Sequence, residues 1–137
     1  MMIQMNERRS KTMMKQIISD KAPAAIGPYS HAYITGNIVF TSGQIPVDPA
    51  SGMIPEGISA QADLSCRNVG LVLEAAGSSL EKVVKTTCFL ADMNDFAAFN
   101  EVYAKYFSSK PARSCVAVKA LPKGVLCEIE AIAEITD

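Results

Sequence analysis

The chain has 137 residues, 49% of them hydrophobic, and a formal net charge of −1. This length allows one domain with a real hydrophobic core, and this composition excludes a chain kept disordered by charge. Apart from Arg8, Arg9 and Lys11 near the N-terminus, the basic residues are scattered. A nucleic acid is therefore not expected as a partner.

The cysteines and the apolar runs indicate the setting of the chain. The four cysteines at positions 66, 88, 115 and 127 form no CxxC pair, so their spacing predicts no zinc site. No apolar run is long enough to cross a bilayer, and the first residues lack the apolar segment of a signal peptide. These features predict a cytoplasmic protein in a reducing compartment, with no membrane partner and no metal.

The N-terminal part alternates between loop and strand patterns. Residues 1–14 hold five of the seven methionines among polar residues, which predicts a disordered extension before a single domain of residues 15–137. A short strand is expected over residues 15–19. Proline and glycine then make residues 22–31 a defined loop. Two strand-like runs around Gly36-Asn37 predict a hairpin over residues 32–42.

Helical spacing follows in two places. Apolar residues at steps of four and three predict a helix over residues 58–76, with Gly77 as its stop. The β-branched run of residues 83–91 predicts a strand. Asn94 is then expected to cap a second helix that ends near residue 107. That helix carries an aromatic stripe expected to pack in the core, namely Phe96, Phe99, Tyr103 and Tyr106.

Residues 111–130 contain the polar groups best suited to chemistry. Two alternating runs flank a Pro-Lys-Gly turn, which predicts a β-hairpin. Antiparallel pairing would set Cys115 opposite Glu128 and Arg113 opposite Glu130, so that all four side chains share one face. The complete order of elements predicts an α+β domain with two helices packed on one sheet.

Each of these groups has a functional and a purely structural interpretation. The Arg113 guanidinium fits a bound carboxylate, but it fits an ion pair with Glu130 equally well. Glu128 could orient or deprotonate a water molecule, or be a solvated strand residue. Cys115 as a nucleophile would need His31, the only histidine, so a site-lining thiol is the favoured interpretation. Glu130 is interpreted as a structural charge.

Short segments in a fixed order resemble the RidA family, also called YjgF/YER057c/UK114. They run from about residue 15 to residue 134 and leave only the N-terminal extension uncovered. The matching segments are Ala-Pro-Ala-Ala-Ile-Gly-Pro-Tyr-Ser (22–30), Thr-Ser-Gly-Gln-Ile-Pro (41–46), Glu-Ala-Ala-Gly (74–77), Val-Lys-Thr-Thr (84–87), Asp-Met-Asn-Asp-Phe (92–96), Pro-Ala-Arg-Ser-Cys-Val (111–116) and Glu-Ile-Glu-Ala (128–131).

The resemblance implies a fold, an assembly and an activity. The fold would be a chorismate-mutase-like subunit with two helices and a six-stranded mixed sheet. Three subunits would form a homotrimer around a central β-barrel, with sites in the clefts between neighbours. Family members of this type are cofactor-independent deaminases. They hydrolyse the imine or enamine acids 2-aminoacrylate and 2-iminobutyrate, released by pyridoxal-phosphate enzymes, to 2-keto acids and ammonia.

The resemblance also implies residue roles. Arg113 would bind the substrate carboxylate, while Glu128 and the backbone at Cys115 would position the attacking water; these three are the expected catalytic positions. Four further residues would bind substrate: Tyr29 closing the site, Ser42 and Gly43 lining it, and Asn100 near the cleft.

The chain also departs from the family pattern. Residues 108–110 form a shorter loop than in many relatives, and His31 stands where relatives often carry glutamine. Cys127 stands where an aliphatic residue is common. These departures leave the substrate preference open. Two other functions are considered beside the deaminase: an endoribonuclease or translation inhibitor, and a non-catalytic binder of small carboxylates or holdase-like protein.

Overall fold

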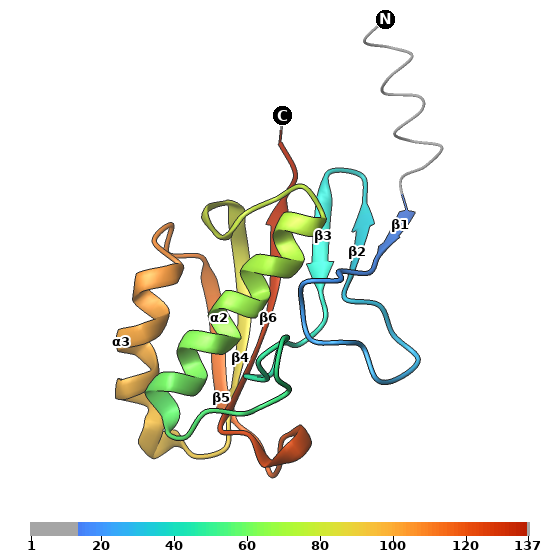
Figure 1. Cartoon of the computed structure of the whole chain (residues 1–137). Coiled ribbons are helices and arrows are strands. Elements are labelled where there is room, and N and C mark those ends of the chain that lie inside the picture. Colours follow the sequence, from blue (N-terminus) through green and yellow to red (C-terminus); the bar gives the residue numbers. More distant parts are fainter. Residues whose placement is uncertain (1–13, 137) are drawn as a thin grey trace, which may run out of the picture.

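Two helices cover one face of a six-stranded mixed sheet in the computed structural model, which describes residues 14–136 (Figure 1). The strand order is β1-β2-β3-β6-β4-β5. The elements are β1 (Met14–Ile17), β2 (Ala32–Thr35), β3 (Ile38–Thr41), α2 (Ile58–Ala75), β4 (Val83–Leu90), α3 (Phe96–Tyr106), β5 (Ala112–Ala117) and β6 (Cys127–Glu134). The predicted α+β architecture is confirmed. The extension predicted over residues 1–14 lies outside the described residues, except for Met14, where β1 begins.

The hairpin predicted around Gly36-Asn37 is present. β2 pairs antiparallel with β3, and Thr35 lies opposite Ile38 at the turn. Gly36 has a φ of 60°, a conformation in which glycine carries no Cβ penalty. The turn residues and the alternation of the flanking strands therefore fixed this element locally.

Helix α2 buries the stripe expected from its spacing. Ala62, Cys66, Val69 and Leu73 are all fully buried, and together they form much of the core beneath the sheet. The helix ends at Ala75, and the predicted stop Gly77 follows two residues later, with a φ of 85° and its N–H donated to the carbonyl of Glu74. Neither helix of the described chain is long and apolar enough to cross a membrane.

Helix α3 begins differently from the prediction. Asp92, rather than Asn94, is the capping residue: its carboxylate accepts a hydrogen bond of 2.9 Å from the Asn94 N–H. A 3₁₀ turn (Met93–Asp95) follows, and the α-helix starts at Phe96. The prediction was wrong because two residues only two positions apart, Asp92 and Asn94, had suitable capping side chains, and the first of them forms the cap.

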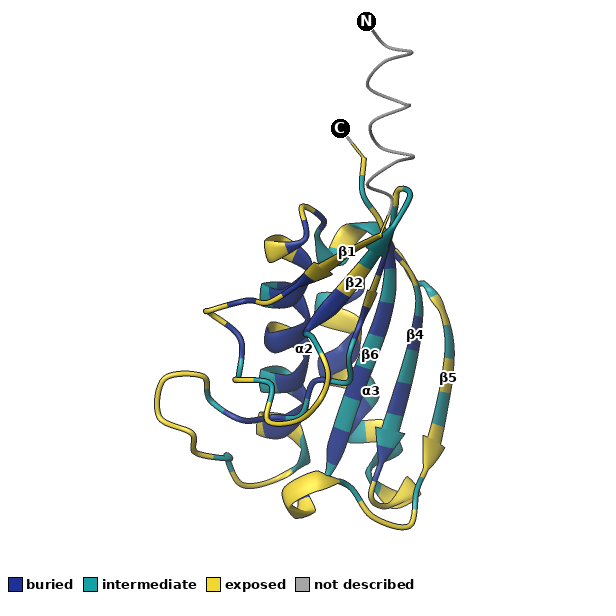
Figure 2. Cartoon of the chain, turned by 90° about the vertical axis from the view of Figure 1, so that its right-hand side faces the viewer, coloured by how far each residue is buried: buried dark blue, intermediate teal, exposed yellow. Residues whose placement is uncertain are grey.

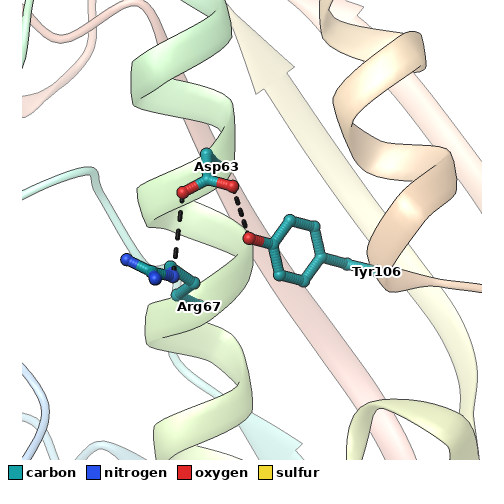
Figure 3. A network of polar contacts seen from close by, with 3 residues as sticks. All are labelled: Asp63, Arg67 and Tyr106. Carbon is teal, nitrogen blue, oxygen red and sulfur yellow. Dashed lines mark hydrogen bonds and ion pairs between the residues drawn. The ribbon is translucent and has the colours of Figure 1, made fainter.

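Polar side chains join the two helices on their outer surface (Figure 3). The Tyr106 hydroxyl of α3 donates a short hydrogen bond to the Asp63 carboxylate of α2. Arg67, one turn along α2, lies 3.7 Å from the same carboxylate. The helix pair is therefore held by this contact outside and by apolar packing against the sheet.

The hairpin predicted over residues 111–130 does not form. β5 and β6 are not neighbours, because β4 lies between them, parallel to β5 and antiparallel to β6. The parallel β4–β5 pair requires a crossover, which α3 provides. The segment 118–126, with its 3₁₀ turn at Pro122–Gly124, passes the end of β4 instead of forming a tight hairpin.

The interposed strand also separates the four polar groups. Arg113 is in register with Thr86 and Ala131, and Cys115 with Cys88 and Ile129. Both rows face the helices. Paired residues share a face of the sheet, and consecutive residues of a strand point to opposite faces. Glu128 and Glu130 flank Ile129 on β6, so their side chains project from the open face of the sheet, which Figure 2 shows. The expectation that all four share one face was wrong.

Candidate active site

Glu128 projects from the open face of the sheet beside the backbone of Gly43. Strand β6 buries Cys127 and Ile129 toward the helices, and the alternation of the strand turns Glu128 the other way. A Cβ atom on Gly43 would overlap the Glu128 carboxyl group and lie 2.8 Å from its Cδ. The glutamate side chain therefore occupies the space that any larger residue at position 43 would fill.

A single backbone bridge brings these two residues together. Beyond the end of β3, the Gln44 N–H donates to the carbonyl of Ile129 at 2.7 Å, and the Ile129 N–H donates to the carbonyl of Gln44 at 3.2 Å. Because the pairing is antiparallel, Gly43 and Glu128 lie diagonally across this bridge, and the Glu128 side chain reaches over the backbone of the glycine.

The environment of Glu128 favours its protonated form. Partial burial raises the pKa of this carboxyl group above its usual 4.5, and the negative charge of Glu130 raises it further. A carboxyl group with a raised pKa exchanges protons more readily near neutral pH than an ordinary glutamate does. Glu128 is therefore suited to acid–base chemistry.

Glu128 lines a cavity of about 770 Å³ together with residues of the loop before β2. Tyr29 stands at this cavity with 48% of its surface exposed, and its ring packs over Gly27. The Ser42 hydroxyl donates a hydrogen bond of 2.6 Å to the carbonyl of Ser30, and its oxygen can still accept one. We call Tyr29, Ser42, Gly43 and Glu128 the glutamate cluster.

Arg113 lies on the other face of the sheet, at the edge strand β5, against helix α3. One guanidinium nitrogen, Nη1, donates to Asn100 Oδ1 at 2.8 Å. The guanidinium carbon is 5.5 Å from the ring centre of Phe96 and 4.8 Å from that of Tyr103, within the range of cation–π attraction. The remaining N–H groups keep a fork that fits a carboxylate. We call Asn100, Arg113 and Cys115 the arginine cluster.

The aromatic rings behind Arg113 are themselves fixed. The Tyr103 hydroxyl lies 2.7 Å from Thr86 Oγ1 in the core, and the Tyr103 ring stacks on Phe107 with centroids 4.4 Å apart. The Arg113 guanidinium therefore lies over the Tyr103 ring, which is held in place by the contact of its hydroxyl with Thr86 and by stacking on Phe107.

Cys115 is a half-buried thiol two residues from Arg113 on the same face. Burial raises its pKa, and the positive charge of Arg113 only partly opposes this effect. A raised pKa leaves little thiolate at neutral pH. His31 lies in the cavity of the glutamate cluster, so the structure does not bring a Cys–His pair together. These features argue for a site-wall role of the thiol.

The structure brings the expected site residues together in two groups rather than one. Asn100, Arg113 and Cys115 are not among the residues that line the 770 Å³ cavity. The two clusters come from opposite faces of one sheet. Within residues 14–136, no three His, Cys, Asp or Glu residues are grouped so that they could hold a metal ion.

Several residues that surround the two clusters were missed or assigned elsewhere from the sequence. Phe96 and Tyr103 were expected only in the core; their positions four before and three after Asn100 put all three on one helix face and could have indicated their place beside Arg113. His31, Asp48 and Lys123 also line the cavity, and nothing local in the sequence marks the last two.

Comparison with known proteins identifies the family. A family model described as endoribonuclease L-PSP matches residues 19–135. The chain belongs to this family, the RidA/YjgF family. It is 52% identical over 125 residues to the 2-iminobutanoate/2-iminopropanoate deaminase of Salmonella typhimurium, covering 88% of this chain and 98% of the relative. It is 54% identical over 123 residues to protein HMF1 of Saccharomyces cerevisiae, covering 89% and 95%.

Solved structures of the RidA/YjgF family share the fold. The YjgF gene product of Escherichia coli superposes with a TM-score of 0.86 at 48% identity, covering 89% of this chain and 99% of that one. TdcF of E. coli, solved with bound serine, gives a TM-score of 0.85 at 49% identity, with the same coverage. The mixed six-stranded sheet with two helices is therefore the family architecture.

Proposed function

We propose that this RidA/YjgF-family protein hydrolyses small 2-imino and enamine acids to 2-keto acids and ammonia. The observation that carries the proposal is the pair of complementary groups in the two clusters. One cluster offers a guanidinium fork held by Asn100 and aromatic rings, and the other a carboxyl group whose pKa is raised. Relatives named 2-iminobutanoate/2-iminopropanoate deaminase, at 50–52% identity, support this choice of substrate.

The chemistry needs one anion-binding group and one proton carrier. Arg113 would bind the substrate carboxylate through two parallel hydrogen bonds and hold the C2 carbon in place. Glu128 would take a proton from water as its oxygen attacks C2 and return that proton to the imine nitrogen, forming a carbinolamine. The same carboxyl group would then carry the hydroxyl proton of the carbinolamine to the nitrogen as the C–N bond breaks, so that ammonia leaves and the keto group forms. An imine and one water thus give a keto acid and one ammonia; an enamine must first tautomerise to the imine.

The two clusters would meet between subunits. Arg113 and Glu128 project from opposite faces of one sheet, so Arg113 of one subunit would act with Glu128 of the partner subunit. The open face also carries large apolar side chains that are partly exposed: the exposed fraction is 44% for Tyr33, 43% for Phe40 and 46% for Val116. A homotrimer built around this face would cover them and place a cleft at each boundary.

Mixing two impaired variants tests the shared site. Arg113→Ala and Glu128→Gln should each be strongly impaired alone when the imine concentration is kept low. After joint denaturation and refolding at equal amounts, about one site in four would combine an intact Arg113 with an intact Glu128. Recovery of activity to about a quarter of the wild-type value supports the shared site. No recovery, with hybrid oligomers present by mass spectrometry, contradicts it.

A coupled assay tests the activity itself. A pyridoxal-phosphate dehydratase generates the imine, semicarbazide competes for it, and formation of the free keto acid is followed. The protein should increase the rate of keto-acid formation in proportion to its concentration. No increase, with protein shown to be trimeric by light scattering, would exclude the deaminase.

The name of the family raises a second candidate, RNA cleavage. Nothing in the two clusters resembles a pair of histidines that could cleave RNA, because the chain has only one. Cleavage that persists in the Arg113→Ala variant after repeated purification would favour this function. Binding of a keto acid in calorimetry without imine turnover would instead favour a non-catalytic binder. The four free cysteines fit a cytoplasmic location.

A further inference from the structure

His31 joins three segments of the chain at the base of the loop that carries Tyr29. It directly precedes β2 and is 2% exposed. Its backbone N–H donates to the carbonyl of Ile17 at 3.0 Å, and its carbonyl accepts the N–H of Ser42 at 2.8 Å. The main chain of His31 is therefore fixed from both sides, by the end of β1 and by the segment after β3.

The imidazole of His31 then bonds the loop itself. Nδ1 accepts the backbone N–H of Ser19 at 2.9 Å, and Nε2 lies 2.6 Å from the carbonyl oxygen of Pro23. A backbone N–H can only donate and a carbonyl oxygen can only accept. These partners require the neutral imidazole with its proton on Nε2.

The segment held in this way forms one wall of the cavity. Pro23, Ala24, Ile26 and Tyr29 line the cavity from this loop, and Glu128 lines the same cavity from β6. Ser42 holds the far end of the loop through the carbonyl of Ser30. The His31 side chain holds the near end at Ser19 and Pro23, so the path of the loop between these two anchors depends on it.

We propose that His31 is a positioning residue whose neutral imidazole latches the Tyr29 loop over the cavity and releases it on protonation. A second proton would sit on Nδ1 and point at the Ser19 N–H, so the two donors must separate. The catalytic consequence rests on the proposed deaminase function: acidification would weaken the cover that Tyr29 gives the substrate.

Other groups near His31 also titrate and must be separated from it. Glu128 has a raised pKa and contributes its own acidic limb to any pH profile. Asp20 and Lys21 lie in the same loop. The charged or titratable side chains that share the cavity with His31 are Tyr29, Asp48, Lys123, Glu128 and Glu130. A variant that changes only the titration of residue 31 is therefore needed.

Glutamine at position 31 provides that variant. The amide of His31→Gln can donate to the Pro23 carbonyl and accept from the Ser19 N–H, as the neutral imidazole does, but it does not titrate. We expect His31→Gln to match the wild-type kcat/KM above neutral pH, whereas His31→Ala is impaired at every pH. On the acidic side of the pH profile, the kcat/KM of the wild type should fall about threefold or more below that of His31→Gln. Superimposable wild-type and glutamine profiles would overturn the proposal.

Nuclear magnetic resonance tests the latch without any activity assay. Because the chain has one histidine, the imidazole ¹⁵N signals belong to His31 alone. They should show the Nε2–H tautomer, and the amide signals of Ser19 and Tyr29 should shift in step with imidazole protonation. The same amides should stay unchanged in His31→Gln over that pH range. An Nδ1–H tautomer would overturn the proposal. So would amide shifts of Ser19 and Tyr29 that do not change as the imidazole is protonated, even if the protein is a deaminase.

Discussion

The arginine cluster and the glutamate cluster are built in contrasting ways. The guanidinium of Arg113 is held by the side chains of one helix, with the ring of Tyr103 anchored in the core by Thr86. Glu128 has a strand backbone, but its surroundings come from loops: the Gly43 segment and the loop latched by His31. One cluster is therefore set by regular packing, and the other by a few long-range backbone contacts.

This contrast assigns different tasks to the two clusters. A rigid cation suits the binding of an anion that every substrate carries, because little side-chain freedom is lost on binding. A carboxyl group surrounded by loops suits the steps in which water enters and ammonia leaves, because loops can open and close during turnover. Changes in the arginine cluster should therefore affect substrate binding, and changes in the glutamate cluster should affect turnover or its pH dependence.

The largest effect is expected from removing the cation. Arg113→Ala should lower kcat/KM by about 100-fold or more, because truncating one partner of a buried charged hydrogen bond costs about 2–5 kcal/mol. The measurement is the coupled keto-acid assay over a range of imine concentrations, with the loss appearing mainly in KM.

Two variants provide the matched controls for Arg113→Ala. Arg67→Ala removes an arginine that is 65% exposed on α2 and should leave kcat/KM unchanged. Cys115→Ala removes the thiol beside Arg113 and should retain most of the activity, which separates a water mechanism from thiol catalysis. Loss of activity in Cys115→Ala comparable with that in Arg113→Ala would contradict the role given to each residue.

A smaller loss is expected from displacing the carboxyl group. Gly43→Ala places a methyl group where the Glu128 carboxyl lies, so the side chain must move. A displacement of about 1 Å costs up to about 100-fold in rate, and we expect kcat to fall by about 10-fold to 100-fold with a smaller change in KM.

The double variant Gly43→Ala/Glu128→Asp shows whether the clash is the cause. The shorter aspartate relieves the overlap, so the two changes should cost less together than the sum of their separate costs. Strict additivity would mean that Gly43 acts through its backbone instead. Circular dichroism confirms that each variant remains folded.

The next effect is a shift of the pH profile rather than a loss. The negative charge of Glu130 contributes, after burial, to the raised pKa of Glu128. Glu130→Gln favours the ionised form of Glu128 and lowers its pKa. Because the general base must be ionised, the acidic limb of kcat/KM should move to lower pH. Glu134→Gln, the same charge change at an exposed position of β6, should leave the limb in place.

The elements of this fold were predictable from the sequence, but the neighbours of one strand were not. Alternation marks β5 and β6 as strands, and nothing in residues 111–130 shows that β4 lies between them. With β4 interposed, Cys115 aligns with Ile129 instead of Glu128. A shift of one residue moves a side chain to the other face of a sheet, so one wrong neighbour reversed the predicted relation of Arg113 and Glu128.

The site residues were identified by resemblance, and their geometry depends on distant contacts. Gly43 reaches Glu128 only through the bridge between Gln44 and Ile129, which are far apart in the sequence. His31 was noted as a departure from the family pattern, yet its bonds to Ser19 and Pro23 follow from the folded path of a loop. No local propensity encodes either contact, because both depend on where the chain returns after folding.

The smallest effect on activity and stability is expected from the Tyr106–Asp63 hydrogen bond, which includes no residue of either cluster. Tyr106→Phe removes the hydrogen bond to Asp63 that joins α3 to α2 (Figure 3) and should leave kcat/KM unchanged. Because Asp63 is 45% exposed, the cost in unfolding free energy should be about 1 kcal/mol or less, measured by urea unfolding at fixed protein concentration. Asp63→Asn keeps an acceptor and should cost less.

The pH dependence of this contact has a definite sign. Burial, and then the hydrogen bond to Asp63, raises the pKa of Tyr106 from 10.0 to about 12. A raised pKa means that the folded state favours the protonated hydroxyl, so its contribution is complete below pH 10.0 and is lost as the pH rises toward about 12. The stability difference between the wild type and Tyr106→Phe should shrink over that interval. A difference that stays constant would mean that folding does not raise the pKa of the Tyr106 hydroxyl, and the hydrogen bond to Asp63 would then not be what joins α3 to α2.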